Sequence, residues 1–281
     1  MAKKLGSDNV TQVKKIAALV IAKNEATMLA GCLSCLGWCD EIVVLDNGST
    51  DNTALIAEQF SARVIHFSHS SFARLREEVI KHTQAEWVLY IDADERVLPM
   101  LAREIAVHME MDKEAALQLP RANIFFGKQF LHGGWGDEFV IRVFKRQSLK
   151  GWKGAIHESP EFTGALGVLK TPLVHLTHRN TVSGLLKTAG WTPLEAQAIY
   201  KANAKPVTIW TMLRKGFMEF LRRAIFKGGY KDGTEGLIEA MIQAWNRMIV
   251  YVQVWELQQK PSLTERYTQI EQEIEAQWKS K

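Results

Sequence analysis

The chain has 281 residues, of which 47% are hydrophobic and 23% are charged, and its formal net charge is +4. That length allows one large domain, or a catalytic domain with a smaller appendage, with a substantial core. So mild a positive charge does not by itself indicate nucleic-acid binding. The N-terminal segment MAKKLGSDNVTQVKK has no apolar signal core, and no apolar stretch is long enough to cross a bilayer. We therefore expect a cytoplasmic protein, which can still lie on a membrane surface.

Strand-like and helix-like segments alternate through the first half of the chain. Short apolar runs predict strands at residues 16–22, 41–46, 62–67 and 87–92. The intervening segments predict helices at residues 25–38, 51–60 and 71–83. Strict alternation implies right-handed crossovers, and it predicts an α/β fold with a mainly parallel sheet and helices on both faces.

Three cysteines lie close together at Cys32, Cys35 and Cys39. A helix that begins near Glu25 would place them on one stripe, and cysteine is among the most buried residue types. Since the sequence has no fourth cysteine, buried free thiols are favoured over an iron–sulfur or zinc site.

Polar clusters directly follow three of the predicted strands. They are KNE at 23–25, DNGSTDNT at 46–53 and DADE at 92–95. Because the carboxyl ends of parallel strands meet at one edge of the sheet, and ligands bind beyond that edge, we expect these clusters to converge on one site. At such a strand end, the carboxylate of Asp46 can accept hydrogen bonds from a base or a ribose.

Asp92 and Asp94 are separated by one residue, so on an extended chain they project to the same side and repel each other. A hard divalent cation would relieve that repulsion, and a cation held by two carboxylates keeps open positions for a diphosphate. The alternative is an N-cap cluster for a helix after Pro99. Glu95 either contacts the site or begins that helix. Neither a dinucleotide-binding glycine motif nor a phosphate-loop lysine follows the first strand.

The second half of the chain changes character. Runs at 116–127, 138–146 and 173–178 predict antiparallel strands that complete a mixed sheet, and from about Thr192 the chain reads as helical. The segment 206–229 predicts a helix with one apolar face, made by Trp210, Leu213, Phe217, Phe220, Leu221 and Ala224. Lys215, Arg222 and Arg223 occupy its other face. Two interpretations stay open, an interfacial helix on anionic lipid headgroups or a helix packed on the catalytic domain.

Four segments of the sequence together resemble glycosyltransferase family 2 proteins of the GT-A fold. They are VIAKNEATMLAGCLSCLGWCDEIVVLDNGSTDNT, WVLYIDADERV, FFGKQFLHGGWGDEFVIRVFKR and IHES. Within the family the chain is most similar to the branch of lipopolysaccharide core β-1,4-glucosyltransferases. The resemblance implies a GT-A catalytic domain over residues 1–190 and a C-terminal amphipathic helical region over 191–281.

The activity implied by the resemblance is an inverting transfer of a hexose, with glucose from UDP-glucose as the branch-level expectation. The implied acceptor is a hydroxyl of a lipopolysaccharide core or another lipid-linked glycan, which points to the inner face of the cytoplasmic membrane and to no nucleic-acid partner. A peptide acceptor and a non-catalytic nucleotide-sugar or glycan-binding scaffold are the alternatives. Nucleotidyltransfer is disfavoured because a glycine-rich phosphate-binding opening is missing.

By motif position, the resemblance also implies roles for individual residues. The nucleotide-sugar-binding set is Lys23, Glu25, Asp46, Asp92, Ala93, Asp94 and Arg142. Within it, Asp92 would contact the ribose or the metal, and Asp94 the metal and the diphosphate. The implied cofactor is Mn²⁺ or Mg²⁺, held by Asp92 and Asp94, with His157 as a further ligand or an outer group. Arg142 would pair with phosphate oxygens, or otherwise form a surface salt bridge.

An inverting transfer needs a base for the acceptor hydroxyl. The family's frequent Glu-Asp base motif is absent, and Asn47 stands where many members have a second aspartate. Glu158 is the favoured base, followed by Glu138 and its neighbour Asp137. His132 and Trp135, with the glycines between them, resemble an acceptor-side loop.

Overall fold

A computed structural model describes residues 15–154, 159–177 and 179–279. The chain forms two compact units. The sheet unit runs to Arg121 and then from Phe139 to His175. The helical unit contains residues 122–138 and everything after His175. The predicted division into residues 1–190 and 191–281 stays a prediction.

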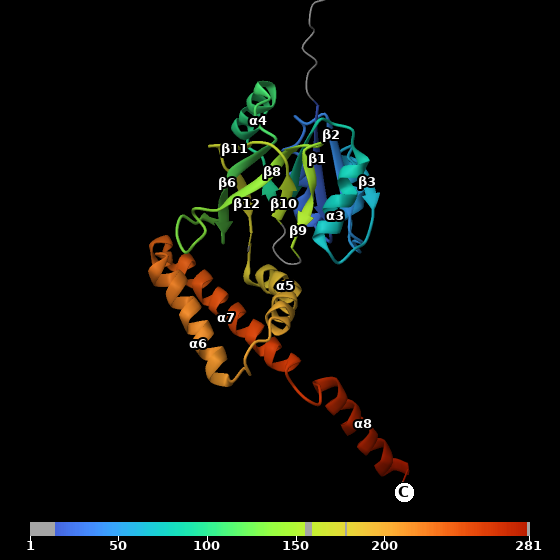
Figure 1. Ribbon diagram of the computed structural model, residues 1–281, viewed down its shortest axis with the longest axis vertical. Coiled ribbons are helices and arrows are strands. Elements are labelled where there is room, and N and C mark those ends of the chain that lie inside the picture. The colour runs from blue at the N-terminus through green and yellow to red at the C-terminus, as the bar shows by residue number, and fades with distance from the viewer. Residues whose placement is uncertain (1–14, 155–158, 178, 280–281) are drawn as a thin grey trace, which may run out of the picture. The chain divides into compact units, whose positions relative to one another are not determined.

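The sheet unit begins with four parallel strands in the order β3-β2-β1-β4 (Figure 1). They are β1 (Ile16–Ala22), β2 (Glu41–Asp46), β3 (Arg63–His66) and β4 (Trp87–Asp92). The connecting helices are α1 (Ala26–Leu33), α2 (Thr53–Gln59) and α3 (Phe72–Val79), which continues into a 3-10 turn at Ile80–His82. The predicted α/β alternation is confirmed. Residues Trp87–Ile91 of β4 are all buried, as a strand covered on both faces requires.

Antiparallel strands complete the sheet, as the sequence predicted. β8 (Phe139–Lys145) pairs with β4 on one side and with β6 (Ala116–Phe125) on the other. Beyond β6 the order continues to β12 (Leu173–Leu176) and β5 (Glu95–Arg96). The remaining elements are α4 (Pro99–Met111), β7 (Lys128–Gln129), β11 (Leu166–Val168), and a separate ribbon of β9 (Leu149–Lys153) and β10 (Ser159–Phe162). The result is a mixed, mainly parallel sheet.

The first helix is shorter than predicted. α1 ends at Leu33, and the chain then turns back so that Asp40 bonds the start of β1, its side chain accepting from the Ile16 amide at 2.8 Å. Cys32 is therefore buried in the helix, whereas Cys35 and Cys39 lie in the following turns and are only half-buried. The expected single stripe is wrong, although all three thiols are free. Burial raises the pKa of Cys39 to about 12.

The helical unit consists mainly of α5 (Thr181–Lys201), α6 (Ile209–Leu221), α7 (Gly233–Leu257) and α8 (Leu263–Lys279). A π turn at Arg222–Phe226 and a 3-10 turn at Gly229–Asp232 join α6 to α7. α5 begins well before the expected Thr192, because Asn180 caps it by accepting from the Ser183 amide at 2.9 Å. In the described part of the chain, no helix has the length and apolar character needed to cross a membrane.

Candidate functional site

The strand register places two predicted site residues on either side of β1. Ala22 of β1 pairs with Asp46 of β2, and Ile21 pairs with Asp92 of β4. The two carboxylates therefore stand at nearly the same height along the sheet, at the carboxyl ends of their strands. The predicted convergence of polar clusters at this edge is confirmed by the register.

The first two clusters interlock through hydrogen bonds. Asn24 lies in the left-handed region at φ 56°. Its side-chain oxygen accepts from the Thr50 amide at 2.7 Å, and its backbone amide donates to Ser49 Oγ at 2.9 Å. The Glu25 amide donates to Thr53 Oγ1 at 2.8 Å. These bonds fix the turn after β1 against the turn after β2, so the side chains at this edge are held in place before any ligand binds.

Asp46 is buried and has two hydrogen-bond partners. Its side chain accepts from the Ser49 amide at 3.2 Å and lies 3.3 Å from His66 Nδ1. His66 ends β3 and is paired in register with Asp46, but its side chain is 70% exposed. A buried carboxylate beside an exposed imidazole therefore stands at the carboxyl end of β2.

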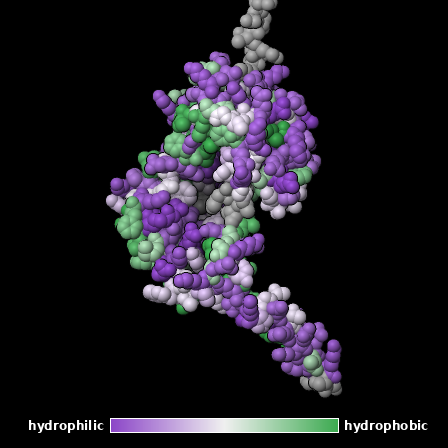
Figure 2. All heavy atoms as spheres, viewed as in Figure 1, coloured by the Kyte–Doolittle hydropathy of each residue, from purple (hydrophilic) through white to green (hydrophobic). Residues whose placement is uncertain are grey.

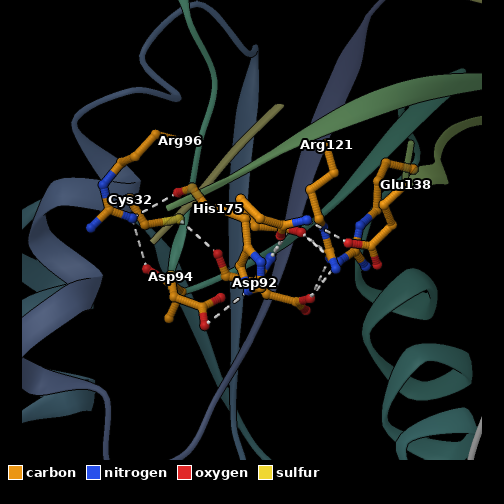
Figure 3. Close-up of polar contacts among 11 residues, drawn as sticks. Cys32, Asp92, Asp94, Arg96, Arg121, Glu138 and His175 are labelled. Carbon is orange, nitrogen blue, oxygen red and sulfur yellow. Dashed lines mark hydrogen bonds and ion pairs between the residues drawn. The ribbon is translucent and has the colours of Figure 1, made fainter. Parts of the chain in front are cut away.

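Asp92 belongs to a cluster of four charges at the end of β4 (Figure 3), which we call the arginine–carboxylate quartet: Asp92, Glu95, Arg121 and Arg142. Arg142 Nη2 donates to Asp92 Oδ2 and, at 2.7 Å, to Glu95 Oε1. Arg121 Nη2 donates to Glu95 Oε1 at 2.5 Å. Glu95 also accepts from the Asp92 amide at 2.9 Å. Two negative and two positive charges thus balance.

The members of the quartet differ in how deeply they are buried, and desolvation acts in opposite directions on the pKa values of Asp92 and Arg142. Glu95 has no exposed surface and the Arg142 side chain is 7% exposed, while the Asp92 side chain is 43% exposed. Desolvation would raise the pKa of Asp92, but Arg142 and then Arg76 outweigh it and hold that pKa below its usual range. Desolvation alone would lower the pKa of Arg142, and its two carboxylate partners raise it instead. Both side chains are therefore charged at neutral pH.

Asp94 lies in the turn after β4, outside the quartet. Its carboxylate is 3.4 Å from His175 Nε2 of β12, a ring that carries charge only when protonated. Arg96 holds this turn, donating to the carbonyl of Ala93 at 2.8 Å and to that of Met28 in α1 at 2.9 Å. Figure 3 shows Asp94 on the side of Arg96 and Asp92 on the side of Arg121, with His175 between the two aspartates. The alternative of an N-cap cluster is wrong, because Leu98 caps α4 without a side-chain bond.

The carboxylates at this edge of the sheet could supply only some of the ligands that a hard cation needs. Across the described residues, no three His, Cys, Asp or Glu side chains are grouped so that they could hold a metal ion. Asp92 and Asp94 supply two oxygen donors, so a divalent ion would need phosphate oxygens or water to complete its shell. Two arginines already pair with Asp92 and Glu95. His157, the third predicted ligand, lies outside the described residues.

The other predicted residues are distributed over the two units. Lys23 is exposed and Glu25 is half-buried at the start of α1, and the structure gives neither of them a ligand-like role by itself. The backbone oxygen of the buried Ala93 accepts from Arg96. Glu138 belongs to the helical unit, where Asn123 Nδ2 donates to it at 2.7 Å. Asp137 is exposed, and Glu158, the favoured base, lies outside the described residues.

Sequence reasoning did not identify His66, Arg121 and His175, each of which contacts a carboxylate at this edge. It also did not identify the quartet role of Glu95. Glu95 neither caps nor begins a helix; it begins the short strand β5. The residues with which Arg121 and His175 interact are far away in sequence, so no local pattern indicates the contacts. Arg142 was predicted either to bind phosphate or to form a surface salt bridge. Its side chain is in fact buried, as is its ion pair with Glu95, while its ion pair with Asp92 is only partly buried.

Comparison with known proteins gives one family. The sequence model described as "Glycosyl transferase family 2" matches residues 17–164. The lipopolysaccharide core biosynthesis glycosyltransferase LpsC of Rhizobium meliloti is 23% identical over 250 residues, covering 86% of this chain and 92% of LpsC. An uncharacterized glycosyltransferase of Rickettsia bellii is 25% identical over 266 residues, covering 87% of each chain.

Solved structures show a more distant likeness. Staphylococcus aureus TarS has 14% sequence identity and a TM-score of 0.44, over 85% of this chain and 90% of the TarS chain. Mycobacterium tuberculosis glucosyl-3-phosphoglycerate synthase, solved with Mn²⁺, UDP and glucosyl-3-phosphoglycerate, has 16% identity and a TM-score of 0.42, over 68% of this chain and 81% of that one.

Proposed function

Since this chain belongs to glycosyl transferase family 2, whose sequence model matches more than half of its length, and is therefore a glycosyltransferase, we propose a specific reaction for it. It moves a hexose, glucose in the first instance, from a nucleoside-diphosphate sugar to a hydroxyl of a lipid-linked glycan. The lipopolysaccharide-core name of the relative LpsC supports the acceptor class. Such an acceptor would place the enzyme at the inner face of the cytoplasmic membrane.

The observation that carries this proposal is the pair of carboxylates at the carboxyl end of β4. Asp92 ends that strand with part of its side chain exposed, and Asp94 lies in the turn that follows, 3.4 Å from His175 Nε2. A diphosphate cannot approach a carboxylate without a cation between them, because like charges repel. Asp94 is therefore proposed to hold a divalent ion, Mn²⁺ or Mg²⁺, which when bound would neutralise charge on the leaving nucleoside diphosphate.

The protein's own side chains would orient the donor. Asp46 and Glu25, beside the interlocked turns, are proposed to contact the nucleotide, with Lys23 at the exposed rim. Asp92 is proposed to accept from the ribose, since Arg142 keeps it ionised and fixes its position while almost half of the side chain stays accessible. Arg142 would then act on the sugar donor through Asp92.

The transfer itself would be a single displacement. The acceptor oxygen forms a bond to the anomeric carbon as the bond from that carbon to the diphosphate oxygen breaks, and the configuration inverts. The acceptor's proton passes to a carboxylate, for which Glu158 is proposed first and Glu138, beside Asp137, second. The nucleoside diphosphate leaves with the electron pair of the broken bond.

A donor panel tests the proposal. The purified protein is incubated with UDP-glucose, UDP-galactose and UDP-N-acetylglucosamine, with Mn²⁺ or with a chelator, and UDP release is measured, followed by mass analysis of extracted lipid products. We expect Mn²⁺-dependent UDP release from UDP-glucose and a mass increase of one hexose on a glycolipid. Binding of donor without any release would identify a scaffold, and a product on peptide alone would overturn the acceptor class.

A further inference from the structure

The helical unit exposes large apolar side chains on the hairpin formed by α6 and α7. We call six of them the hairpin face: Ile209, Trp210, Leu213 and Phe217 on α6, and Met241 and Trp245 on α7. Trp210 is 70% exposed, and the other five range from 50% to 70%. Monomeric soluble proteins rarely leave a patch of this kind uncovered. Figure 2 shows apolar side chains along the outer edge of this hairpin.

The two rows of the hairpin face lie on the same side of the helix pair. The helices are antiparallel, since Gly216 lies against Met248 and Ala244, while Val207 before α6 bonds Gln258 after α7. Leu213 and Phe217 each follow a buried interface residue by one position, and Trp245 follows Ala244, which is half-buried and whose carbonyl oxygen lies against Gly216. When two helices are antiparallel, the residue that follows an interface residue projects toward the same side of the pair on both helices. The six side chains therefore form one surface rather than two.

Charge around this surface is predominantly positive. Within residues 209–245, all of which are described, the carboxylates of Glu219, Asp232 and Glu239 are buried. The fourth carboxylate, Glu235, lies 3.3 Å from Lys128 Nζ. By contrast, Arg214, Lys227 and Lys231 are exposed. The hairpin face includes tryptophan side chains and is bordered by exposed cations, while most carboxylates of these helices are buried. Such a surface complements an anionic lipid surface.

We propose that the hairpin face docks on an anionic lipid bilayer, with α6 and α7 lying in the interface and Arg214, Lys227 and Lys231 at the headgroups. This proposal deepens the proposed function, because it assigns the membrane contact of the enzyme to a particular surface. It rests on the proposed function only in taking the acceptor to be lipid-linked. Vesicle binding needs neither donor nor acceptor, so it can fail or succeed independently of transfer.

Docking here would also position a loop of the same unit. Asp232, at the tip of the hairpin, accepts from the His132 amide at 2.8 Å and lies 2.9 Å from His132 Nδ1. Arg223 donates to the Gly133 carbonyl at 3.1 Å and stacks on Trp135. The loop 131–136, which was predicted to face the acceptor, is thus fastened to the element proposed to touch the membrane. A lipid-linked acceptor and this loop would meet at the same surface.

The chain contains its own control for exposed apolar surface. None of the residues Leu263–Lys279 of α8 is buried, and Ile270 and Ile274 are 51% and 52% exposed. However, α8 carries four glutamates against Arg266 and Lys279. If exposed apolar side chains alone caused binding, α8 would bind as well as the hairpin. If charge complementarity is also needed, α8 would contribute little on anionic lipid.

The test is co-sedimentation of the full-length protein with sucrose-loaded vesicles of phosphatidylcholine, with and without phosphatidylglycerol, at low and at high salt. We compare Leu213→Gln/Phe217→Gln in the hairpin face with the matched pair Ile270→Gln/Ile274→Gln in α8. All four side chains are exposed, so folding should survive, and thermal unfolding by circular dichroism checks it. We expect the hairpin variant to bind anionic vesicles about tenfold or more weakly, and the α8 variant to bind like the wild type.

Four outcomes would overturn the proposal. One is no sedimentation of the wild type with anionic vesicles at low salt. Another is a loss of binding in the α8 variant that exceeds the loss in the hairpin variant. The third is a dimer by light scattering that Leu213→Gln/Phe217→Gln converts to a monomer without changing vesicle binding, which would identify a second copy of the chain as the occupant. Equal binding to neutral and anionic vesicles would exclude the headgroup contacts.

Discussion

Arg142 bonds two carboxylates three positions apart in the chain, Asp92 at the exposed end of β4 and the fully buried Glu95. One guanidinium nitrogen serves both, so the orientation of Asp92 depends on a residue that no ligand can reach. The position of the exposed carboxylate is therefore set from inside the protein.

Replacing Arg142 by methionine should destabilise the protein markedly. The substitution leaves Glu95 buried with Arg121 as its remaining arginine partner, and breaking a buried ion pair from one side costs about 3–5 kcal/mol of unfolding free energy. Urea unfolding measures the change. The matched control is Arg74→Gln, whose ion pair with Glu77 is at the surface, with the arginine side chain 69% exposed, and which should change stability by less than about 0.5 kcal/mol. Equal effects of the two substitutions would mean that the quartet does not stabilise the fold.

Asp94→Asn and Asp92→Asn should separate metal binding from the integrity of the quartet. Because Asp94→Asn leaves the ion pairs of Asp92 and Glu95 with Arg142 and Arg121 in place, this variant should keep most of its stability while losing Mn²⁺-dependent UDP release by about 100-fold or more. Asp92→Asn should lose both activity and stability, because Arg142 then keeps a single carboxylate. Calorimetric titration of Mn²⁺ with UDP, alongside urea unfolding, gives both readouts. Unchanged Mn²⁺ affinity in Asp94→Asn would remove that residue from the metal site.

Glu158→Gln and Glu138→Gln should identify the base. General-base catalysis contributes about 10²–10⁴-fold, so the glutamine variant of the true base should lose that much transfer while it still binds UDP. We expect this of Glu158→Gln. Glu138→Gln should show a smaller effect, because Glu138 already accepts from Asn123. Normal turnover of the Glu158 variant would exclude it from the mechanism and favour Glu138.

The decrease in the free energy of unfolding at acid pH should include a contribution from the protonation of Asp92. Its pKa in the folded protein is below the ordinary value of about 3.9, mainly because Arg142 and Arg76 overcome desolvation. The stabilisation is therefore fully present above that ordinary value and is lost as the pH falls through the lower, folded-state pKa. Urea unfolding from pH 7 to pH 3 should show a shallower acid decline in Asp92→Asn than in the wild type. Parallel declines would show that the ion pair contributes no pH dependence.

The GT-A fold class and the edge where the site lies were predictable from the sequence. Strict alternation determines which strands are parallel, and once β2 and β4 flank β1, Asp46 and Asp92 must end on either side of it. Local pattern could not reveal the arginine–carboxylate quartet. Glu95 is bonded by Arg121 and Arg142, which are brought to it by β6 and β8, and no periodicity within DADE indicates such distant residues.

The predicted apolar face of α6 was only partly correct, for a related reason. Helical spacing does group Trp210, Leu213 and Phe217, but these side chains are exposed, while the residues buried against α7 include Gly216 and Glu219. Spacing reports which side chains share a face, and it does not report what covers that face. Gly216 is buried because it allows the close approach of Met248, which is a property of the partner helix.

The hydrogen bonds that Asp232 accepts from the loop 131–136 bear on how this protein can be divided. The segment 122–138 separates the two stretches of the sheet unit, yet its hydrogen-bonding partners include Arg223, Lys227 and Asp232, in the last quarter of the chain. A protein truncated after residue 190 would retain this loop and lose all three partners. The C-terminal helices thus supply hydrogen-bond partners to a segment 100 residues earlier in the sequence, and we expect a truncation that removes them to leave that segment without these bonds.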